Sequence, residues 1–244
     1  KNLTYAVEGE KGRVEILNNI DLRIDKGKFV VITGPNGSGK TTLAKAIMGL
    51  VSADTGKISG SIIYDGKELI DMSVTERARL GVSYGFQQPP RFKGMKVTDL
   101  LSIAAGKVLK YDENCAFLSQ VGLCTGEYLK REIDSGLSGG ELKRIEIATL
   151  LARDASLLIF DEPEAGIDLW SFSKLTETFK EIHKKKKDTT IIIISHQERI
   201  IKLADEIVLL RDGAVTRTGS SDDILPYIIE DTVPECTFLE GAAK

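Results

Sequence analysis

The chain has 244 residues, of which 42% are hydrophobic and 28% charged, and its formal net charge is −3. This length and composition are typical of one α/β domain with a buried core. The small net charge gives no electrostatic reason to expect nucleic acid or an anionic membrane as a partner. The longest apolar runs, such as Ile191 to Ile194, are too short for a bilayer span, which excludes direct membrane insertion.

The three cysteines, Cys115, Cys124 and Cys236, have no metal-binding spacing and are an odd number. Reduced thiols are the favoured interpretation, and we expect a cytoplasmic protein. A role of Cys236 in metal handling stays open.

The first predicted elements are strands. Residues 1–33 alternate apolar and polar positions, with a turn signal at Asp25-Lys26-Gly27, which predicts antiparallel strands. A β-branched strand from Phe29 to Thr33 leads into a glycine-rich loop and then a helix from Thr41 to about Leu50. A hairpin is expected around Ser59 to Gly66.

From about residue 90 onward, the sequence pattern predicts helices inserted between strands of one sheet. The region from about 90 to 150 is rich in Leu, Ile and Ala and predicts helices without a strong strand. Leu157–Phe160 and Thr190–Ile194 are continuous apolar runs, which indicate buried parallel strands. Val208–Leu210 and Ala214–Thr218 predict a closing hairpin. We therefore expect one α/β domain over residues 1–244.

The glycine-rich loop fits the phosphate-binding pattern G-x-x-x-x-G-K-[ST] between a strand and a helix. Its residues are Gly34, Pro35, Asn36, Gly37, Ser38, Gly39, Lys40, Thr41 and Thr42. The glycines allow backbone N–H groups to surround phosphate oxygens at the start of a helix. We expect Lys40 to bridge the β- and γ-phosphates and Thr41 to bind Mg²⁺.

A second motif lies at the end of the buried strand, where Asp161 and Glu162 follow Leu157–Phe160. Ligands of open α/β sheets bind at the carboxyl ends of the strands. Asp161 is a hard oxygen donor suited to Mg²⁺, and Glu162 is the natural base for the attacking water.

A third motif, Ser138-Gly139-Gly140-Glu141, follows Leu137. Ser138 and the two glycine amides can open a helix and bind an anion, while Glu141 occupies the fourth position of a capping box. A plain helix cap and an anion site are compatible.

With the other two motifs, this stretch resembles the signature of the ABC ATPase family. The resemblance implies a P-loop NTPase core with a mixed parallel sheet, an N-terminal antiparallel β subdomain and a helical subdomain inserted at about 90–150. It also implies hydrolysis of ATP with Mg²⁺ between two copies of the chain. The signature residues and Asp168 of one copy would then contact nucleotide held by the other.

Further residues match the family. Gln87 matches the Q-loop glutamine that senses the γ-phosphate and Mg²⁺, Ala165–Asp168 match the D-loop, and His196 matches the switch histidine. The resemblance therefore implies Glu162, His196 and Gln87 as catalytic residues, and Thr41, Gln87 and Asp161 as Mg²⁺ ligands. His183, beside Lys184–Lys187, is expected to be solvated.

One position departs from the family pattern. The aromatic residue that stacks on the adenine base is replaced by Val7, and Tyr5 lies two residues before it.

The residues around two of these motifs favour one branch of the family. Ser138–Ile147 resembles the SGGE-x-KR-x-EI run of SufC-type ATPases. Glu164-Ala165-Gly166 also resembles the SufC sequence, whereas transport subunits usually have Pro-Thr-Ser-Ala-Leu-Asp there. This resemblance implies ATP-driven dimer closure that reshapes a SufB/SufD-type scaffold in iron–sulfur cluster assembly. The alternative is the motor subunit of an ABC transporter. In either case Gln87–Met95, with Phe92 and Met95, is the expected docking segment, unless both side chains fold into the helical core.

Overall fold

The computed structural model describes residues 1–9, 12–51, 56–123, 125–134 and 136–230. Cys124 and Cys236 therefore lie outside the described residues, whereas Cys115 is a free, partly buried thiol.

A six-stranded sheet forms the centre of the molecule, with the strand order β13-β12-β3-β11-β10-β7. Strands β12, β3, β11, β10 and β7 run parallel, and β13 pairs antiparallel with β12. The bounds are β3 (Phe29–Thr33), β7 (Val82–Gly85), β10 (Leu157–Asp161), β11 (Thr190–Ile194), β12 (Glu206–Arg211) and β13 (Ala214–Gly219). The two expected buried parallel strands and the closing hairpin are confirmed.

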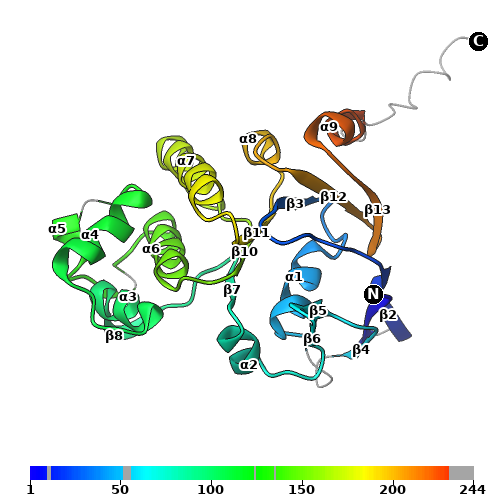
Figure 1. Ribbon diagram of the computed structural model, residues 1–244, viewed down its shortest axis with the longest axis horizontal. Helices are drawn as coiled ribbons and strands as arrows, with labels where there is room; N and C mark the ends of the chain where they lie inside the picture. Colours follow the sequence, from blue (N-terminus) through cyan, green and yellow to red (C-terminus); the bar gives the residue numbers. More distant parts are fainter. Residues whose placement is uncertain (10–11, 52–55, 124, 135, 231–244) are drawn as a thin grey trace, which may run out of the picture.

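Both faces of this sheet are covered, which explains the continuous apolar runs. Ile191 and Ile193 belong to one hydrophobic cluster, and Ile192 and Ile194 belong to the other. Helix α1 (Lys40–Met48) and α2 (Val74–Arg79) lie on one side of the sheet in Figure 1. Helices α7 (Leu169–Lys185), α8 (Glu198–Ile201) and α9 (Ser221–Glu230) lie on the other side.

The N-terminal strands form a separate antiparallel sheet in the order β2-β1-β4. It contains β1 (Leu3–Gly9), β2 (Gly12–Ile20) and β4 (Lys57–Ser59). The expectation for residues 1–33 is thus right for β1 and β2 and wrong for Phe29–Thr33, which pairs in parallel in the central sheet. The hairpin near residue 60 is β5 (Ile63–Tyr64) with β6 (Lys67–Glu68), so it begins later than expected because Ser59 pairs with β1.

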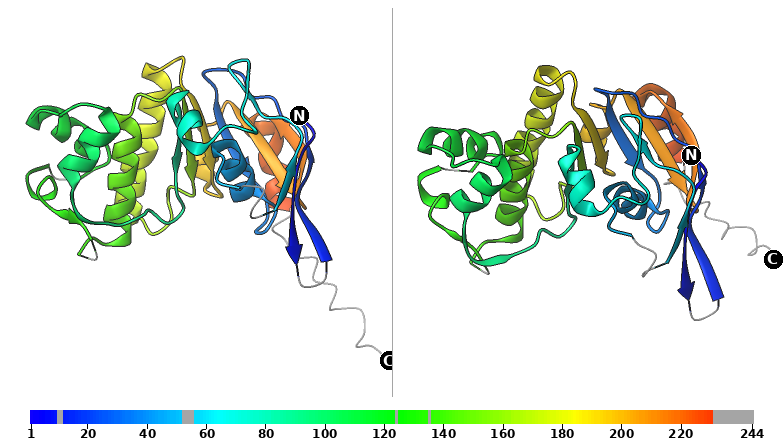
Figure 2. Two further views of the ribbon diagram at one scale, coloured as in Figure 1. Left: turned by 90° about the horizontal axis from the view of Figure 1, so that it is seen from below. Right: turned by 60° about the horizontal axis from the view of Figure 1, so that its bottom comes forward.

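Between β7 and β10 the chain leaves the sheet and forms a helical lobe, which both views of Figure 2 show beside the sheet. It contains α3 (Val97–Ala105), α4 (Tyr111–Gln120), α5 (Thr125–Tyr128) and α6 (Gly139–Ala152). Two short antiparallel strands, β8 (Phe92–Lys96) and β9 (Glu132–Ile133), correct the expectation of a region without strands. They are too short to show a clear alternation.

Two smaller differences concern single residues. Helix α1 ends before Gly49, whose φ of 81° is left-handed, and not at Leu50. His183 is not simply solvated, because its ring packs edge-on against Phe29 with centroids 5.7 Å apart. Its Nε2 also lies 3.3 Å from a carboxylate oxygen of Asp205.

Candidate active site

Four neighbouring strands deliver the predicted site residues to one edge of the sheet. Strands β3, β11, β10 and β7 are adjacent and parallel, so their carboxyl ends meet. The glycine-rich loop follows β3, His196 follows β11, Asp161 and Glu162 end β10, and Gln87 follows β7. The fold thus gathers residues from four distant parts of the sequence.

The glycine-rich loop is held close to the neighbouring strands. Gly34 has a φ of 143°, and a Cβ there would lie 1.9 Å from the carbonyl oxygen of Leu210. Only glycine fits this position. Lys40 is buried, and its Nζ donates to the carbonyl oxygens of Gly34 and Pro35, both at 2.8 Å. The lysine therefore braces the loop that precedes its own helix.

The polar groups at the start of α1 fit a phosphate group. Ser38 Oγ is buried and has no hydrogen-bond partner within the described part of the chain. Burial lowers the pKa of Lys40, and the negative charges of Glu162 and Asp161 oppose this lowering. An unpaired hydroxyl, a buried cation and a helix N-terminus together make a site for an anion.

The Asp161 carboxylate is buried and oriented by two hydroxyl groups. Thr41 Oγ1 donates to Asp161 Oδ1 at 3.0 Å, and Tyr84 OH donates to Asp161 Oδ2 at 2.7 Å. Burial raises the pKa of Tyr84, as does the bonded carboxylate, so the phenol stays a donor. Hydroxyl and carboxylate oxygens side by side fit Mg²⁺, which also takes phosphate oxygens and water as ligands.

Gln87 and Glu162 are in direct contact. Gln87 Nε2 donates to Glu162 Oε2 at 2.7 Å. The backbone of Glu162 has a left-handed φ of 45°, and its N–H donates to the Ile194 carbonyl at 3.0 Å. A left-handed non-glycine residue at the end of a strand is strained and is often found at functional sites. This geometry turns the carboxylate toward Gln87.

His196 is exposed at the end of the segment after β11. Local desolvation lowers the pKa of its imidazole, the positive charge of Lys40 lowers it further, and Glu162 has the opposite effect. The lowered pKa favours the neutral imidazole, in which one ring nitrogen is a donor and the other an acceptor.

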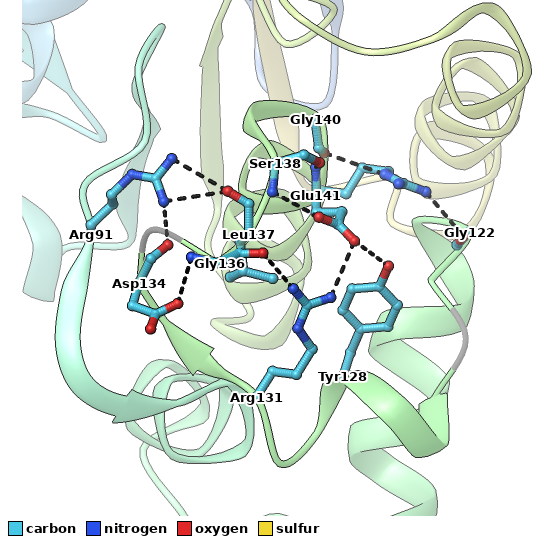
Figure 3. A network of polar contacts seen from close by, with 11 residues as sticks. Arg91, Gly122, Tyr128, Arg131, Asp134, Gly136, Leu137, Ser138, Gly140 and Glu141 are labelled. Carbon is cyan, nitrogen blue, oxygen red and sulfur yellow. Dashed lines mark hydrogen bonds and ion pairs between the residues drawn. The ribbon is translucent and has the colours of Figure 1, made fainter.

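The signature segment begins α6 with a complete capping box. Ser138 N donates to Glu141 Oε2 at 2.7 Å, and Glu141 N donates to Ser138 Oγ at 3.2 Å. Figure 3 shows Tyr128 and Arg131 reaching the same carboxylate from the preceding segment. These donors, with Tyr128 first, lower the pKa of Glu141 to about 2. Both carboxylate oxygens of Glu141 accept hydrogen bonds from the surrounding loop, so this side chain holds the loop in shape.

The D-loop packs beside the signature segment of the same chain. A Cβ on Gly140 would lie 2.8 Å from the Gly166 carbonyl oxygen. Asp168 is the N-cap of α7, and its Oδ1 accepts from the N–H groups of Trp170 and Ser171, both at 3.0 Å. In this structure the Asp168 carboxylate is thus a helix cap.

Two regions predicted to act together lie apart. In the described residues no hydrogen bond joins the signature segment (137–141) to the glycine-rich loop (34–42). Figure 1 shows α6 in the helical lobe and α1 on the other side of β10 and β7. Neither region completes the other within one chain.

The predicted base-stacking position lacks a ring. Tyr5 is only 3% exposed and is part of the core beside Leu3 and Leu17, so it cannot face a bound base. Val7 packs partly against the same core.

Sequence reasoning missed four residues that shape the site. Tyr84 orients Asp161, Lys143 and Glu146 contact the segment before Gln87, and Glu164 accepts a hydrogen bond from Ser195 Oγ at 2.6 Å. Lys143, Glu146 and Glu164 stood out in the sequence as part of the SufC-like stretches, but their contacts did not, and Tyr84 is one polar group on a short, buried strand.

The fold and this edge of the sheet define a P-loop nucleoside triphosphatase. A family model described as "ABC transporter" matches residues 17–165. Over 220 residues the chain is 37% identical to an uncharacterized ABC transporter ATP-binding protein of Methanocaldococcus jannaschii, covering 88% of this chain and 86% of that protein. It is 33% identical over 250 residues to the probable branched-chain amino acid transport ATP-binding protein LivG of Archaeoglobus fulgidus, covering 94% and 92%.

A solved structure has the same fold. The dimeric ATP-binding cassette MJ0796, bound to ADP and phosphate, superposes with a TM-score of 0.77 at 23% identity, covering 91% of this chain and 97% of that one. The chain belongs to the ABC family and is an ATP-binding, ATP-hydrolysing domain. No helix among residues 1–9, 12–51, 56–123, 125–134 and 136–230 is long and apolar enough to cross a membrane.

Proposed function

We propose that this chain is the ATP-hydrolysing motor subunit of a membrane transporter. The observation that carries the proposal is the gathering of Lys40, Asp161, Glu162 and Gln87 at one sheet edge in a chain whose relatives include a transport ATP-binding protein. Such a subunit acts through a partner that contains the membrane-spanning part.

The residues have separate roles in this proposal. Lys40 and the amides of the glycine-rich loop bind the β- and γ-phosphates, and Thr41, Asp161 and Gln87 would hold Mg²⁺. When bound, Mg²⁺ would supply positive charge that stabilises the negative charge of the phosphates. Glu162 accepts the proton of the attacking water, Gln87 orients that carboxylate, and His196 donates a hydrogen bond to the γ-phosphate.

The complete site requires a second copy of the chain. The signature segment and the glycine-rich loop of one chain lie apart, and the solved relative MJ0796 is dimeric. We propose that ATP closes two copies so that Ser138, Gly139 and Gly140 of one contact phosphate bound by the other. Asp168 would lie at the same interface, as the cap of α7.

The partner would dock beside Gln87. Phe92 is 39% exposed on β8, whereas Met95 packs against the core of the helical lobe. Of the two apolar residues in the expected docking segment, Phe92 is therefore the one available to a partner. Its replacement, Phe92→Asp, should leave ATP binding and the melting temperature unchanged and abolish co-purification with the partner. Capture of a membrane permease by the wild-type chain supports the transporter proposal.

A second candidate is the ATPase of a Suf-type iron–sulfur cluster assembly machine, acting on a SufB/SufD-type scaffold. Three SufC-like residues are buried or partly buried and form hydrogen bonds or ion pairs near the site: Lys143, Glu146 and Glu164. The residues that carry the resemblance to SufC therefore contact the site and are not incidental surface positions. The same co-purification separates the candidates, because a partner without a membrane-spanning segment would refute the transporter and support cluster assembly.

A further inference from the structure

Both backbone groups of Phe86, the residue before Gln87, are bonded to side chains of α6. Glu146 Oε1 accepts from Phe86 N at 2.8 Å, and Lys143 donates its Nζ hydrogen to the Phe86 carbonyl. Lys143 and Glu146 lie 3.4 Å apart, with side chains only 2% and 10% exposed. Their i,i+3 spacing places both on one side of the helix. A single buried ion pair therefore holds this backbone unit from both ends.

The same lysine also reaches the strand that carries Asp161. Lys143 Nζ lies 3.3 Å from the Asp161 carbonyl oxygen, to which it donates. One ammonium group thus joins α6 to the ends of both β7 and β10. Because α6 begins at Ser138, the helix that presents the signature segment also holds the segment that carries Gln87.

An ion pair on α7 has the same i,i+3 spacing but is exposed to solvent. Lys174 and Glu177 have the same i,i+3 spacing and lie 3.6 Å apart, but their side chains are 45% and 65% exposed. Exposed pairs of this kind contribute little to stability. A buried pair is costly to desolvate and is retained where additional hydrogen bonds compensate. The hydrogen bonds of Lys143 and Glu146 to the Phe86 backbone are such compensating bonds.

We propose that Lys143 and Glu146 are positioning residues for ATP hydrolysis: they fix Phe86 to α6 and so keep Gln87 against Glu162. A shift of α6 then moves Gln87 with it, which couples the signature segment of a chain to its own hydrolysis site. The proposal rests on the role assigned to Gln87, and it does not depend on which partner the motor drives.

The test compares Glu146→Leu, which removes the acceptor for Phe86 N–H, with Glu146→Gln, which keeps an acceptor of the same size. In the full chain, Glu146→Leu should lower kcat by about ten- to a hundredfold, because small misplacements of catalytic groups have effects of this size. The Kd for ATP should not change, since the glycine-rich loop is untouched. Glu146→Gln should restore most of kcat, and Glu177→Leu on α7 should match the wild type.

A double-mutant cycle with Gln87→Ala decides whether the effect passes through Gln87. The loss from Glu146→Leu should largely disappear in the Gln87→Ala protein. Fully additive losses, a parallel loss of ATP affinity, or an unchanged kcat in Glu146→Leu would overturn the proposal. Normal turnover of Gln87→Ala would remove the role of Gln87 itself. If the melting curve shows that Glu146→Leu does not fold, Lys143→Met replaces it in the cycle.

Discussion

Helices α1 and α6 both begin at a glycine-containing loop, yet their N-termini are built differently. Helix α1 has Gly39 as N-cap, with a φ of 95° and no side-chain cap, and no acidic residue in its first turn. Helix α6 has Ser138 as N-cap and Glu141 in a full capping box. The first N-terminus leaves its amides for an external anion, whereas the second is already shaped by its own side chains.

The difference shows how the two halves of a composite site can be prepared. The loop before α1 is held by the close approach of Gly34 to the Leu210 carbonyl and by Lys40, which donates to the carbonyl oxygens of Gly34 and Pro35. The loop before α6 is shaped by side chains from the helical lobe, including Arg91, which donates to the Leu137 carbonyl at 3.4 Å (Figure 3). The α1 site is therefore held by its own loop and the neighbouring strands, whereas the α6 site is held by side chains of the helical lobe.

The largest effect is expected from Glu162→Gln, which damages the hydrolysis site next to α1 and leaves α6 intact. The amide cannot accept the proton of water, so turnover should fall by about 10²–10⁴. ATP binding should persist, because Lys40 and the loop are unchanged, and a closed ATP-bound dimer should accumulate. Steady-state hydrolysis and size-exclusion chromatography with ATP measure both results. Normal turnover would exclude Glu162 as the base.

The next prediction tests the start of α1 and the start of α6 separately, by mixing one variant that has a defect in the first with one that has a defect in the second. Lys40→Ala removes the phosphate counter-charge, and Gly139→Asp places a carboxylate where an added Cβ meets no atom within 4 Å. Each variant alone should lose about a hundredfold in rate, the scale for losing one oxyanion donor. A mixture should regain partial activity, because one site of the mixed dimer has an intact loop and an intact signature.

A second mixture is the control for this experiment. Lys40→Ala mixed with Glu162→Gln carries both defects on the α1 side, so no intact site can form and no activity should return. Recovery in this second mixture, or none in the first, would contradict a site shared between two copies.

The site was predictable where its pattern is local. Gly34–Thr42 and Asp161-Glu162 are consecutive residues next to a buried strand, so their spacing alone indicates a phosphate site. Tyr84 and Glu146 were not predictable, because their partners Asp161 and Phe86 are 77 and 60 residues away in the sequence. His183 was predicted as solvated for the same reason, since Phe29 and Asp205 are brought to it only by the sheet.

A smaller effect is expected at the base-binding end of the α1 site. If Val7 is at the stacking position, Val7→Tyr should strengthen ATP binding by up to about 1–3 kcal/mol, the range for base–aromatic stacking. Discrimination against GTP should be shallow in the wild type. Calorimetric titration with ATP and GTP measures both. Val7→Leu is the matched control, since it adds bulk without a ring, and equal gains in both variants would point to packing and not to stacking.

The smallest effect concerns the α6 side, where Glu141 should make stability depend on pH. Its folded pKa of about 2 lies below the usual 4.5, so between these values the unfolded chain binds more protons than the folded one. Its stabilising contribution is therefore complete above about pH 4.5 and is lost as the pH falls toward 2. Urea midpoints at pH 6 and pH 3 should differ less in Glu141→Gln than in the wild type.

The control for this measurement is Glu177→Gln on α7, whose carboxylate is exposed and pairs only with Lys174 among its described neighbours. It should keep the wild-type difference between pH 6 and pH 3. Tyr128→Phe should behave like a weaker Glu141→Gln, because it removes the first of the donors that hold the carboxylate charged. An unchanged pH difference in Glu141→Gln would mean that the signature loop keeps its shape without this carboxylate, and the contrast between α1 and α6 would then lie in their backbones alone.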